Sequence, residues 1–496
     1  MTDLEKSAAN TANKENGDVV LKFLGEHHDA SHLDEVCDMD VVRKIDWRIV
    51  PLMLLCYTLQ FLDKVVLNYA NVMGLAEDTN LVGNEFSWLP TAFFIAYLFA
   101  EFPQGFFLQK FPPSTVLGIN VMIWGVTTAC TAACNNFGGL LAVRILLGMS
   151  EAAITPCLLL ITTMWYTKRE ASFRCGIWYC GLGLGQITGG ILSFLFQLMT
   201  TDFEGWRVLF IVLGVINLIA GVLAYFFLPK NLISCTFLTD SEKYHIITKL
   251  SKNQTGTESR KFEPKQALEL VLDIQSWLLL LLTTCISFSS NTITTFSSID
   301  IASFGFNSKE AALLNMPSGV VSIVSTLVST YFVMKGVTRW VALCVLILPA
   351  CTGGALLSFL PKDNQAGLLV GIYLINTVVA PLAIVYSWVN ANFAGHTKKI
   401  GANIFISIGF SLGNIVGPQS YRAEEAPQYL SAKISMLGTQ ASCILIAVVI
   451  FAIYYLRNKK KDREAARSEA ENEEDEIINA FSNLTDFQNR NFRYSY

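Results

Sequence analysis

The stretch Arg144-Ile-Leu-Leu-Gly148-Met-Ser-Glu151-Ala-Ala-Ile-Thr-Pro156 places two full charges inside an apolar run that covers about residues 137–165. That run is long enough to cross a membrane as a helix. At 3.6 residues per turn, Arg144, Gly148, Glu151 and Thr155 are expected to share one narrow face of this helix. A charge at the centre of a membrane-spanning helix costs about 2.5–3.5 kcal/mol on insertion scales, so this face must be shielded from lipid.

Two interpretations of the charged face are open. Ionisable groups inside a membrane mark transport pathways by default, which predicts that the face lines a bundle interior or a wet cavity. The alternative is a structural ion pair that only joins helices. The sequence favours the transport interpretation, because the two charges stand on one face of one helix.

The composition indicates a membrane protein. Of 496 residues, 52% are hydrophobic and only 15% are charged, whereas soluble domains have about 25% charged residues. The net charge of −4 gives no reason to expect nucleic-acid binding. The twelve cysteines form no paired metal-binding clusters, and the five histidines lie in tails, loops or at a span end. We therefore expect no metal and no cofactor.

Apolar windows of spanning length predict an all-α polytopic membrane protein with twelve transmembrane helices in two pseudo-symmetric six-helix halves. The windows lie near 49–72, 87–108, 116–135, 138–160, 175–199, 207–228, 275–297, 313–334, 339–360, 367–388, 400–418 and 434–456. The predicted units are an N-terminal tail (1–47), a first half (48–228), a middle loop (229–274), a second half (275–456) and a C-terminal tail (457–496). The polar start of the chain predicts no cleavable signal peptide.

Lysine and arginine predict the orientation. The short loops that would lie inside with the N-terminus are basic, and the opposite loops are mostly acidic or neutral, which predicts that both termini are cytosolic. Arg422 and Lys433 are exceptions to this pattern. The sequence favours the plasma membrane, with the endoplasmic reticulum or another internal membrane as the alternative, and a functional monomer.

An internal repeat supports the two halves. Residues 181–190 of the fifth window (GLGLGQITGG) parallel residues 409–418 of the eleventh (GFSLGNIVGP) at an offset of 228 residues. Such duplication is typical of transporters, whose substrate site lies near the midplane between the repeats. For the glycines themselves, close helix packing is favoured over substrate contact.

The first window carries a polar stripe that resembles the charged face of the fourth. Adding the repeat offset to Asp63 gives Asn291, so the seventh window offers an uncharged counterpart. Glu101 could titrate or could anchor the loop that follows it. The candidate substrate-binding residues are Tyr57, Gln60, Lys64, Asn68, Arg144 and Asn291, and the candidate proton-coupling residues are Asp63, Glu151 and Glu101.

The motifs as a set resemble the major facilitator superfamily, in particular the fungal, allantoate permease-like branch of the anion:cation symporter family. The matching motifs are Leu62-Asp63-Lys64, Arg144-x-x-x-Gly148-x-x-Glu151-Ala, Gly205-Trp206-Arg207, Asn392-x-Ala394-Gly395-His396-Thr397-Lys398-Lys399, Gly413-Asn414-Ile-Val-Gly417-Pro418-Gln419 and Ala426-Pro427-x-Tyr429. Gln186 departs from the superfamily's antiporter signature, where a proline stands, and this favours symport. Lys64 replaces the family's arginine, which keeps the charge but loses the planar fork.

The resemblance implies proton-coupled symport of a small organic anion, such as allantoate, nicotinate or pantothenate, by alternating access across the lipid bilayer. In this hypothesis Arg144 or Lys64 attracts the substrate carboxylate, and Asp63 or Glu151 takes the proton. One alternative is a proton-independent facilitator of a neutral solute. A second is a nutrient sensor with transporter architecture. An enzyme is not expected, because no nucleophile–base set is recognisable.

Overall fold

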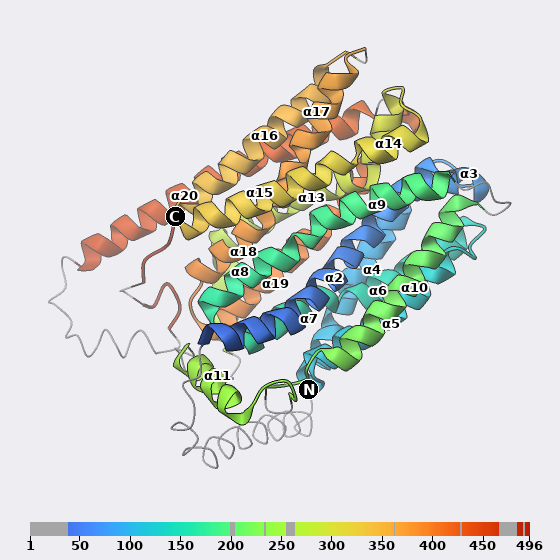
Figure 1. The fold of residues 1–496 in the computed structure, drawn as a ribbon. Helices are drawn as coiled ribbons and strands as arrows, with labels where there is room; N and C mark the ends of the chain where they lie inside the picture. Colours follow the sequence, from blue (N-terminus) through green and yellow to red (C-terminus); the bar gives the residue numbers. More distant parts are fainter. Residues whose placement is uncertain are drawn as a thin grey trace.

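The computed structural model describes residues 38–198, 204–232, 235–253, 263–361, 363–426, 429–465, 484–489 and 492–496. Twelve helical stretches in these ranges are long and apolar enough to cross a membrane. Figure 1 shows them as two groups of long, tilted helices that lie side by side. The predicted all-α polytopic fold with twelve spans in two six-helix halves is confirmed.

We call the first six spans the N bundle and the last six the C bundle. The N bundle consists of α2 (Asp38–Val72), α4 (Glu85–Lys110), α5 (Pro113–Thr131), α6 and α7 (Phe137–Glu151 and Ile154–Trp165), α8 and α9 (Lys168–Tyr179 and Gly181–Gln197) and α10 (Gly205–Phe227). The C bundle consists of α13 (Ile274–Ser303), α14 and α15 (Ser308–Leu314 and Met316–Met334), α16 (Arg339–Phe359), α17, η2 and α18 (Gln365–Ile375, Asn376–Val379 and Pro381–Asn392), α19 (His396–Val416) and α20 (Leu430–Ala465). The short connecting helices are α3 (Leu75–Asp78), α11 (Asp240–Asn253), α12 (Pro264–Leu272), η3 (Gly417–Ser420) and η4 (Ala423–Glu425).

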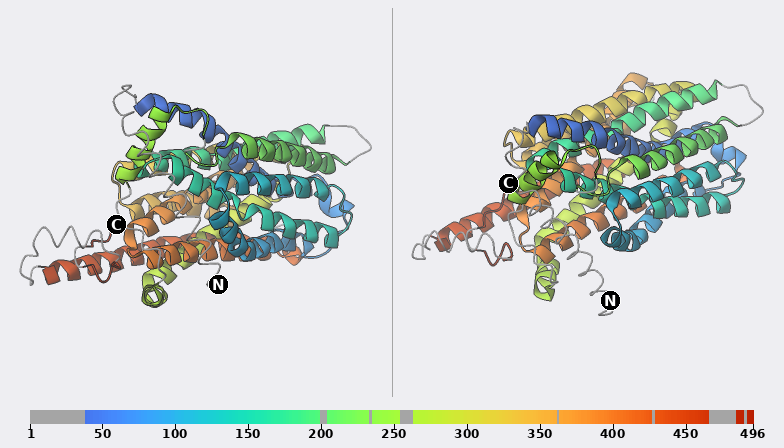
Figure 2. Two further views of the ribbon diagram at one scale, coloured as in Figure 1. Left: turned by 90° about the horizontal axis from the view of Figure 1, so that it is seen from below. Right: turned by 60° about the horizontal axis from the view of Figure 1, so that its bottom comes forward.

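The end of the bundles where α2 begins is called proximal, and the end where α2 finishes is called distal. Helix α2 begins at Asp38, well before the apolar window near residue 49. Val41, Ile45 and Ile49 are buried at a spacing of four residues, so one apolar face carries the helix through a polar stretch. At the other end of the chain, α20 continues beyond the C bundle (Figures 1 and 2).

The glycine repeat serves helix packing in both bundles. A Cβ on Gly185 would lie 2.9 Å from the Thr58 backbone oxygen, and one on Gly413 would lie 2.3 Å from the Thr284 backbone oxygen. Helix α9 therefore packs closely on α2 in the N bundle, and α19 packs in the same way on α13 in the C bundle. The favoured interpretation of these glycines, close packing, agrees with the structure.

Several spans are interrupted midway. The fourth span breaks at Ala152 and Ala153, directly after Glu151. Pro156 lacks the N–H that would bond to the Ala152 carbonyl, and its ring crowds that carbonyl, so the proline ends α6 one turn before itself. Pro381 marks a comparable break between η2 and α18. Discontinuous helices of this kind are common where transporters bind substrate.

Helix α11 lies at the proximal end of the N bundle (Figure 1). Lys249 Nζ lies 2.7 Å from an Asp38 oxygen and 2.6 Å from a Glu170 oxygen. Burial would raise the pKa of Glu170, but the hydrogen bond and charge contact with Lys249 and the hydrogen bonds with Thr167 together outweigh burial, and the pKa is lowered. Burial would lower the pKa of Lys249, but the bonds to Asp38 and Glu170 outweigh it and the pKa is raised.

We expect Lys249→Met to release α11 from the N bundle and to speed proteolytic cleavage within residues 235–253. The Glu170 contribution is present above its usual pKa of 4.5 and is lost as pH falls through the lowered pKa. The Lys249 contribution is present below its usual pKa of 10.5 and is lost as pH rises through the raised pKa. Limited proteolysis with an acid-active protease, from about pH 6 to about pH 3, measures the acid limb. Lys243→Met, on the same helix, is the control, and equal cleavage rates for the two variants would contradict the anchoring role.

Candidate functional site

Arg144 and Asp63 meet between α6 and α2. Arg144 Nη1 lies 3.5 Å from Asp63 Oδ2, and the two side chains are only 3% and 2% exposed. Thr128 of α5 donates a hydrogen bond to Asp63 Oδ1 at 3.3 Å. The Arg144 guanidinium also lies 5.8 Å from the centre of the Phe210 ring. The charged face of the fourth span therefore points into the N bundle and away from lipid.

Lys64 and Glu151 form a second contact in the same place. Lys64 Nζ lies 3.5 Å from Glu151 Oε2, with Lys64 20% exposed and Glu151 fully buried. The ammonium lies 5.8 and 5.9 Å from the ring centres of Phe93 and Phe94 on α4. Among the four charged side chains, Lys64 is the one that solvent or a solute can reach.

The four side chains, Asp63, Lys64, Arg144 and Glu151, make up what we call the charge cluster. Glu151 interacts electrostatically with all three of the others. The two carboxylates of the charge cluster balance its two cations, which reduces the free-energy cost of keeping charges at membrane depth.

The charge cluster has few hydrogen bonds for a group of buried charged side chains. Within the described part of the chain, Arg144 Nε and Nη2 and both Glu151 oxygens have no hydrogen-bond partner. Lys398 at the proximal end of the C bundle provides the comparison, since its ammonium lies 2.7, 2.9 and 3.2 Å from three carboxylates. Buried charges without full hydrogen bonding are costly, so the charge cluster gains more from a new ligand or proton than the Lys398 site does.

Glu101 links the two bundles. Ser407 of α19 donates a hydrogen bond to Glu101 Oε1 at 2.7 Å. Tyr97 lies one turn earlier on α4, and its ring centre is 6.3 Å from that of Phe93, the ring beside Lys64. Glu101 therefore stands about two turns along α4 from a residue that contacts the charge cluster, at a contact between the two bundles.

Asn68 and Asn291 hold helices together. Asn68 Nδ2 donates to Ser297 Oγ at 3.0 Å, across the distal part of the bundle interface. Asn291 Nδ2 donates to the Asn414 backbone oxygen at 2.9 Å, which joins α13 to α19. Neither side chain joins the charge cluster through these bonds.

Tyr57 and Gln60 share the buried part of α2 with the charge cluster. The Tyr57 ring lies 4.7 Å from the Trp178 ring and 5.6 Å from the Tyr179 ring, measured between centroids. Gln60 is 3% exposed. Both side chains are buried in the interior of the protein.

Hydrogen bonds between the bundles gather at the distal end. Gln419 Nε2 donates to Thr91 Oγ1 at 2.8 Å, and Ser87 donates to the Tyr421 backbone oxygen at 3.1 Å. Gln186 Nε2 donates to Asn315 Oδ1 at 3.1 Å. These bonds hold the distal ends of the two bundles together.

A buried charged group in the C bundle was missed by the sequence analysis. Asp300 of α13 is fully buried, Lys433 Nζ lies 3.4 Å from its Oδ1, and Tyr421 donates to its Oδ2 at 2.6 Å. Lys433 had stood out only as an exception to the charge pattern of the loops. That exception was the available signal, because a lone lysine at the wrong end of a span needs a buried partner.

Comparison with known families decides the identity of the fold. The profile of the Major Facilitator Superfamily matches residues 53–418, which hold most of both bundles. The chain belongs to the Major Facilitator Superfamily. Like other members, it is a membrane transporter and not an enzyme.

Curated relatives in this superfamily match nearly the whole chain. The Thiamine pathway transporter THI73 of Saccharomyces cerevisiae is 36% identical, with 100% of this chain and 98% of the relative covered. The Allantoate permease of the same yeast is 31% identical, with 91% and 85% covered. These relatives agree with the allantoate permease-like branch that the motifs indicate.

Solved structures of the superfamily share the fold. A D-xylose–proton symporter superposes with a TM-score of 0.62 at 12% identity, covering 82% of this chain and 97% of that one. A bacterial homologue of the human lysosomal transporter Spinster, in an inward-facing and occupied conformation, gives a TM-score of 0.57 at 17% identity, with 82% and 96% covered.

Proposed function

We propose that the protein is a proton-coupled symporter of a small organic anion that works by alternating access. The charge cluster carries this proposal, because it places one reachable cation, Lys64, against a buried carboxylate, Glu151, that has no hydrogen-bond partner among the described residues. In this mechanism the two halves, residues 48–228 and 275–456, rock about the site, while residues 229–274 connect them.

The coupling step is an exchange of partners. A substrate carboxylate approaches Lys64 Nζ and takes the place of Glu151. A buried carboxylate that loses its cation binds a proton more readily, so Glu151 takes up a proton as the anion arrives. When the anion leaves on the other side, Lys64 attracts the carboxylate again and the proton is released. Asp63 and Arg144 can repeat the same exchange at the second contact.

Glu101 supplies a further proton site in this proposal. As a carboxylate it accepts a hydrogen bond from Ser407, and as a carboxylic acid it can donate one instead. Since this bond crosses the bundle interface, protonation of Glu101 changes the contact that must open. An anion that enters a negative cell interior costs about 2.3 kcal/mol per 100 mV, so uptake with more protons than negative charges is driven by the membrane potential.

The basic loops support an orientation with both termini cytosolic. In this orientation the distal end faces outward. We propose an inward-facing state, which the hydrogen bonds that join the two bundles at the distal end support. We propose a monomer in the plasma membrane, with the endoplasmic reticulum or another internal membrane as the alternative. The similarity to the Thiamine pathway transporter THI73 and to the Allantoate permease supports a substrate related to thiamine metabolism or an allantoate-like carboxylate.

Proton-driven uptake by Asp63→Asn and Glu151→Gln tests the proposal. We expect both variants to lose accumulation driven by an acidic exterior, because neither can take the coupling proton at the altered position. A panel of radiolabelled carboxylates and thiamine-related compounds, in a transporter-deficient cell, supplies the assay. Glu310→Gln is the matched control, since Glu310 is exposed in the cap of α14. Full proton-driven uptake by both site variants would remove these carboxylates from the mechanism.

A facilitator of a neutral solute is the second candidate. The charge balance favours it, because each candidate cation of the charge cluster already faces a carboxylate. Such a facilitator would show uptake that ignores external pH and uncouplers, whereas the symporter would lose accumulation when an uncoupler is added.

A further inference from the structure

The end of the chain forms a bound peptide on the proximal face of the C bundle. We call residues 484–496 the strap; the structure describes 484–489 and 492–496. The strap lies against the proximal ends of α16, α18, α19 and α20 and against α12.

Two asparagines each form a pair of hydrogen bonds with the backbone N–H and C=O of one strap residue. Asn458 of α20 donates to the Tyr494 backbone oxygen at 2.9 Å and accepts from the Tyr494 N–H at 2.8 Å. Asn392 of α18 donates to the Ser495 backbone oxygen at 2.9 Å and accepts from the Ser495 N–H at 2.6 Å. Paired donor and acceptor bonds to a backbone recognise an extended peptide, so these contacts are those of a built peptide site.

The same face supplies further polar contacts to the last residues. Trp388 Nε1 donates to the Ser495 backbone oxygen at 3.1 Å. The Arg339 N–H donates to the Tyr496 backbone oxygen at 2.8 Å, and the Arg339 guanidinium donates to the Ser495 hydroxyl. Helices α16 and α18 are thereby joined through the strap.

A buried charge fixes the other end of the strap. Lys398 Nζ lies 2.7 Å from Asp486 Oδ1, and both side chains are fully buried. The Tyr494 hydroxyl donates to Asp486 Oδ2 at 2.7 Å. Asp486 therefore ties the beginning of the strap to α19 and to Tyr494 near the end of the strap.

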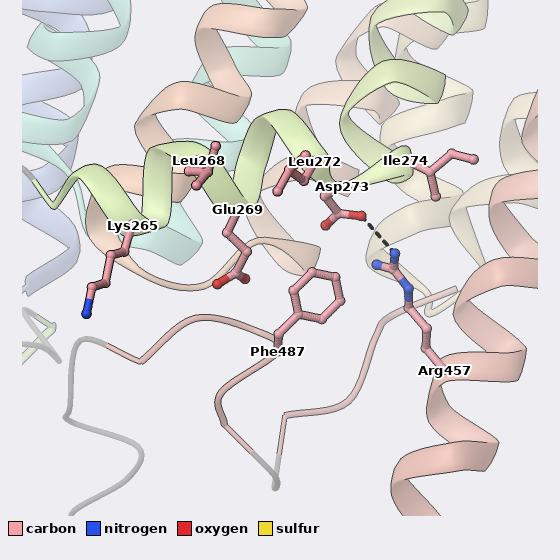
Figure 3. A pocket seen from close by; sticks show the side chains of 8 residues that line it. All are labelled: Lys265, Leu268, Glu269, Leu272, Asp273, Ile274, Arg457 and Phe487. Carbon is pink, nitrogen blue, oxygen red and sulfur yellow. Dashed lines mark hydrogen bonds and ion pairs between the residues drawn. The ribbon is translucent and has the colours of Figure 1, made fainter.

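Aromatic rings fill the space between these polar contacts. The Tyr494 ring stacks on the Tyr454 ring with centroids 5.1 Å apart. Figure 3 shows Phe487 beneath α12, in a pocket with Glu269, Asp273 and Arg457. Its ring centre lies 4.0 Å from Lys398 Nζ and 4.8 Å from Arg457 Cζ, so the ring contacts two cations of the site.

The contacts also account for the Asn392–Lys399 motif, which the transport mechanism leaves unexplained. Asn392 holds Ser495 and Lys398 holds Asp486, as described above. Gly395 has a φ of +85°, and a Cβ there would lie 2.8 Å from Gln266 of α12 and 3.1 Å from Thr485 of the strap. The motif therefore combines two strap ligands with a glycine that lets the strap and α12 approach.

We propose that the proximal face of the C bundle is a specific binding site for the peptide of residues 484–496. The peptide acts as a tethered ligand that holds together the proximal ends of α16, α18, α19 and α20. The described polar contacts and ion pairs of the strap fall on the C bundle and α12, so the strap stiffens one half and does not lock the two halves together. Helix α19 carries Ser407, the partner of Glu101, so bracing holds the C-bundle side of that contact in place. Binding of the strap does not depend on the proposed function. Only the effect of strap binding on transport rests on the proposed function.

The test severs the strap without preventing folding. A protease site inserted within residues 466–483 lets the purified full chain fold first and be cleaved afterwards. We expect the released peptide to stay with the protein during gel filtration, and a fluorescent 484–496 peptide to rebind protein from which it has been washed. In Asp486→Asn, peptide dissociation should be about tenfold faster or more, because its charge-assisted contact with Lys398 is lost.

The controls separate specific binding from general stickiness. Asn403→Ala, at a partly buried side chain that bonds within α19, should leave peptide retention unchanged, whereas Asn392→Ala and Asn458→Ala should each weaken it. Loss of the peptide should lower the thermal unfolding midpoint, and added peptide should restore it. Immediate separation of the peptide from unaltered cleaved protein, or equal retention of a scrambled peptide, would overturn the proposal. Because retention needs no substrate, failure of symport would leave this result intact.

Discussion

Arg144→Gln is expected to abolish transport and to lower the free energy of unfolding by about 3–5 kcal/mol, as when one partner of a buried ion pair is removed. The substitution leaves Asp63 buried, with Thr128 as a weak partner at 3.3 Å. It also removes one of the two positive charges that balance the cluster. Thermal unfolding in detergent and substrate uptake in cells, each corrected for protein amount, measure the two effects.

A double variant separates folding from transport. Asp63→Asn combined with Arg144→Gln removes both charges, so much of the lost stability should return while uptake stays absent. Arg207→Gln is the comparison at a structural arginine, because Arg207 Nη1 donates to the backbone oxygens of Ala132 and Cys134 at 2.7 and 3.1 Å. That variant should lose stability but keep uptake per folded molecule. Transport by the double variant would show that the Asp63–Arg144 contact is only structural.

Sequence periodicity predicted which faces carry charge, but it could not predict which charges meet. Arg144 and Glu151 stand two turns apart on one helix, and each faces a different member of the adjacent pair Asp63 and Lys64. That arrangement depends on how α6 is rotated against α2, which neither helix's own pattern contains. The break after Glu151 was open to prediction, since the quoted stretch itself ends in Pro156.

Other contacts could not be predicted for a similar reason. Asn68 and Asn291 belong to polar stripes, yet their amides bond to neighbouring helices, and a stripe alone does not say whether it faces a cavity or another helix. The strap was out of reach for a different reason. Its contacts join residues about 100 positions apart in sequence, such as Asn392 and Ser495, and no local pattern marks a short polar tail as a ligand.

Gly148→Ala is expected to disrupt the charge cluster through packing alone. Gly148 lies between Arg144 and Glu151 on the same face of α6, and a Cβ there would stand 2.2 Å from the Phe93 backbone oxygen and 3.2 Å from the Tyr97 backbone nitrogen. Backbone atoms cannot rotate away as a side chain can, so α4 and α6 must separate. Forced overpacking of this kind costs about 1–3 kcal/mol or more.

The separation also predicts a change in function, because α4 carries the Phe93 and Phe94 rings beside Lys64, together with Tyr97 and Glu101. We expect a lower unfolding midpoint and strongly reduced uptake, measured as for Arg144→Gln. Gly438→Ala is the matched control, since a Cβ at Gly438 in α20 meets no atom within 4 Å. There the alanine should leave uptake unchanged and stabilise the helix by about 0.5–1 kcal/mol. Equal behaviour of the two alanines would mean that the close approach of α4 to α6 does not position the cluster.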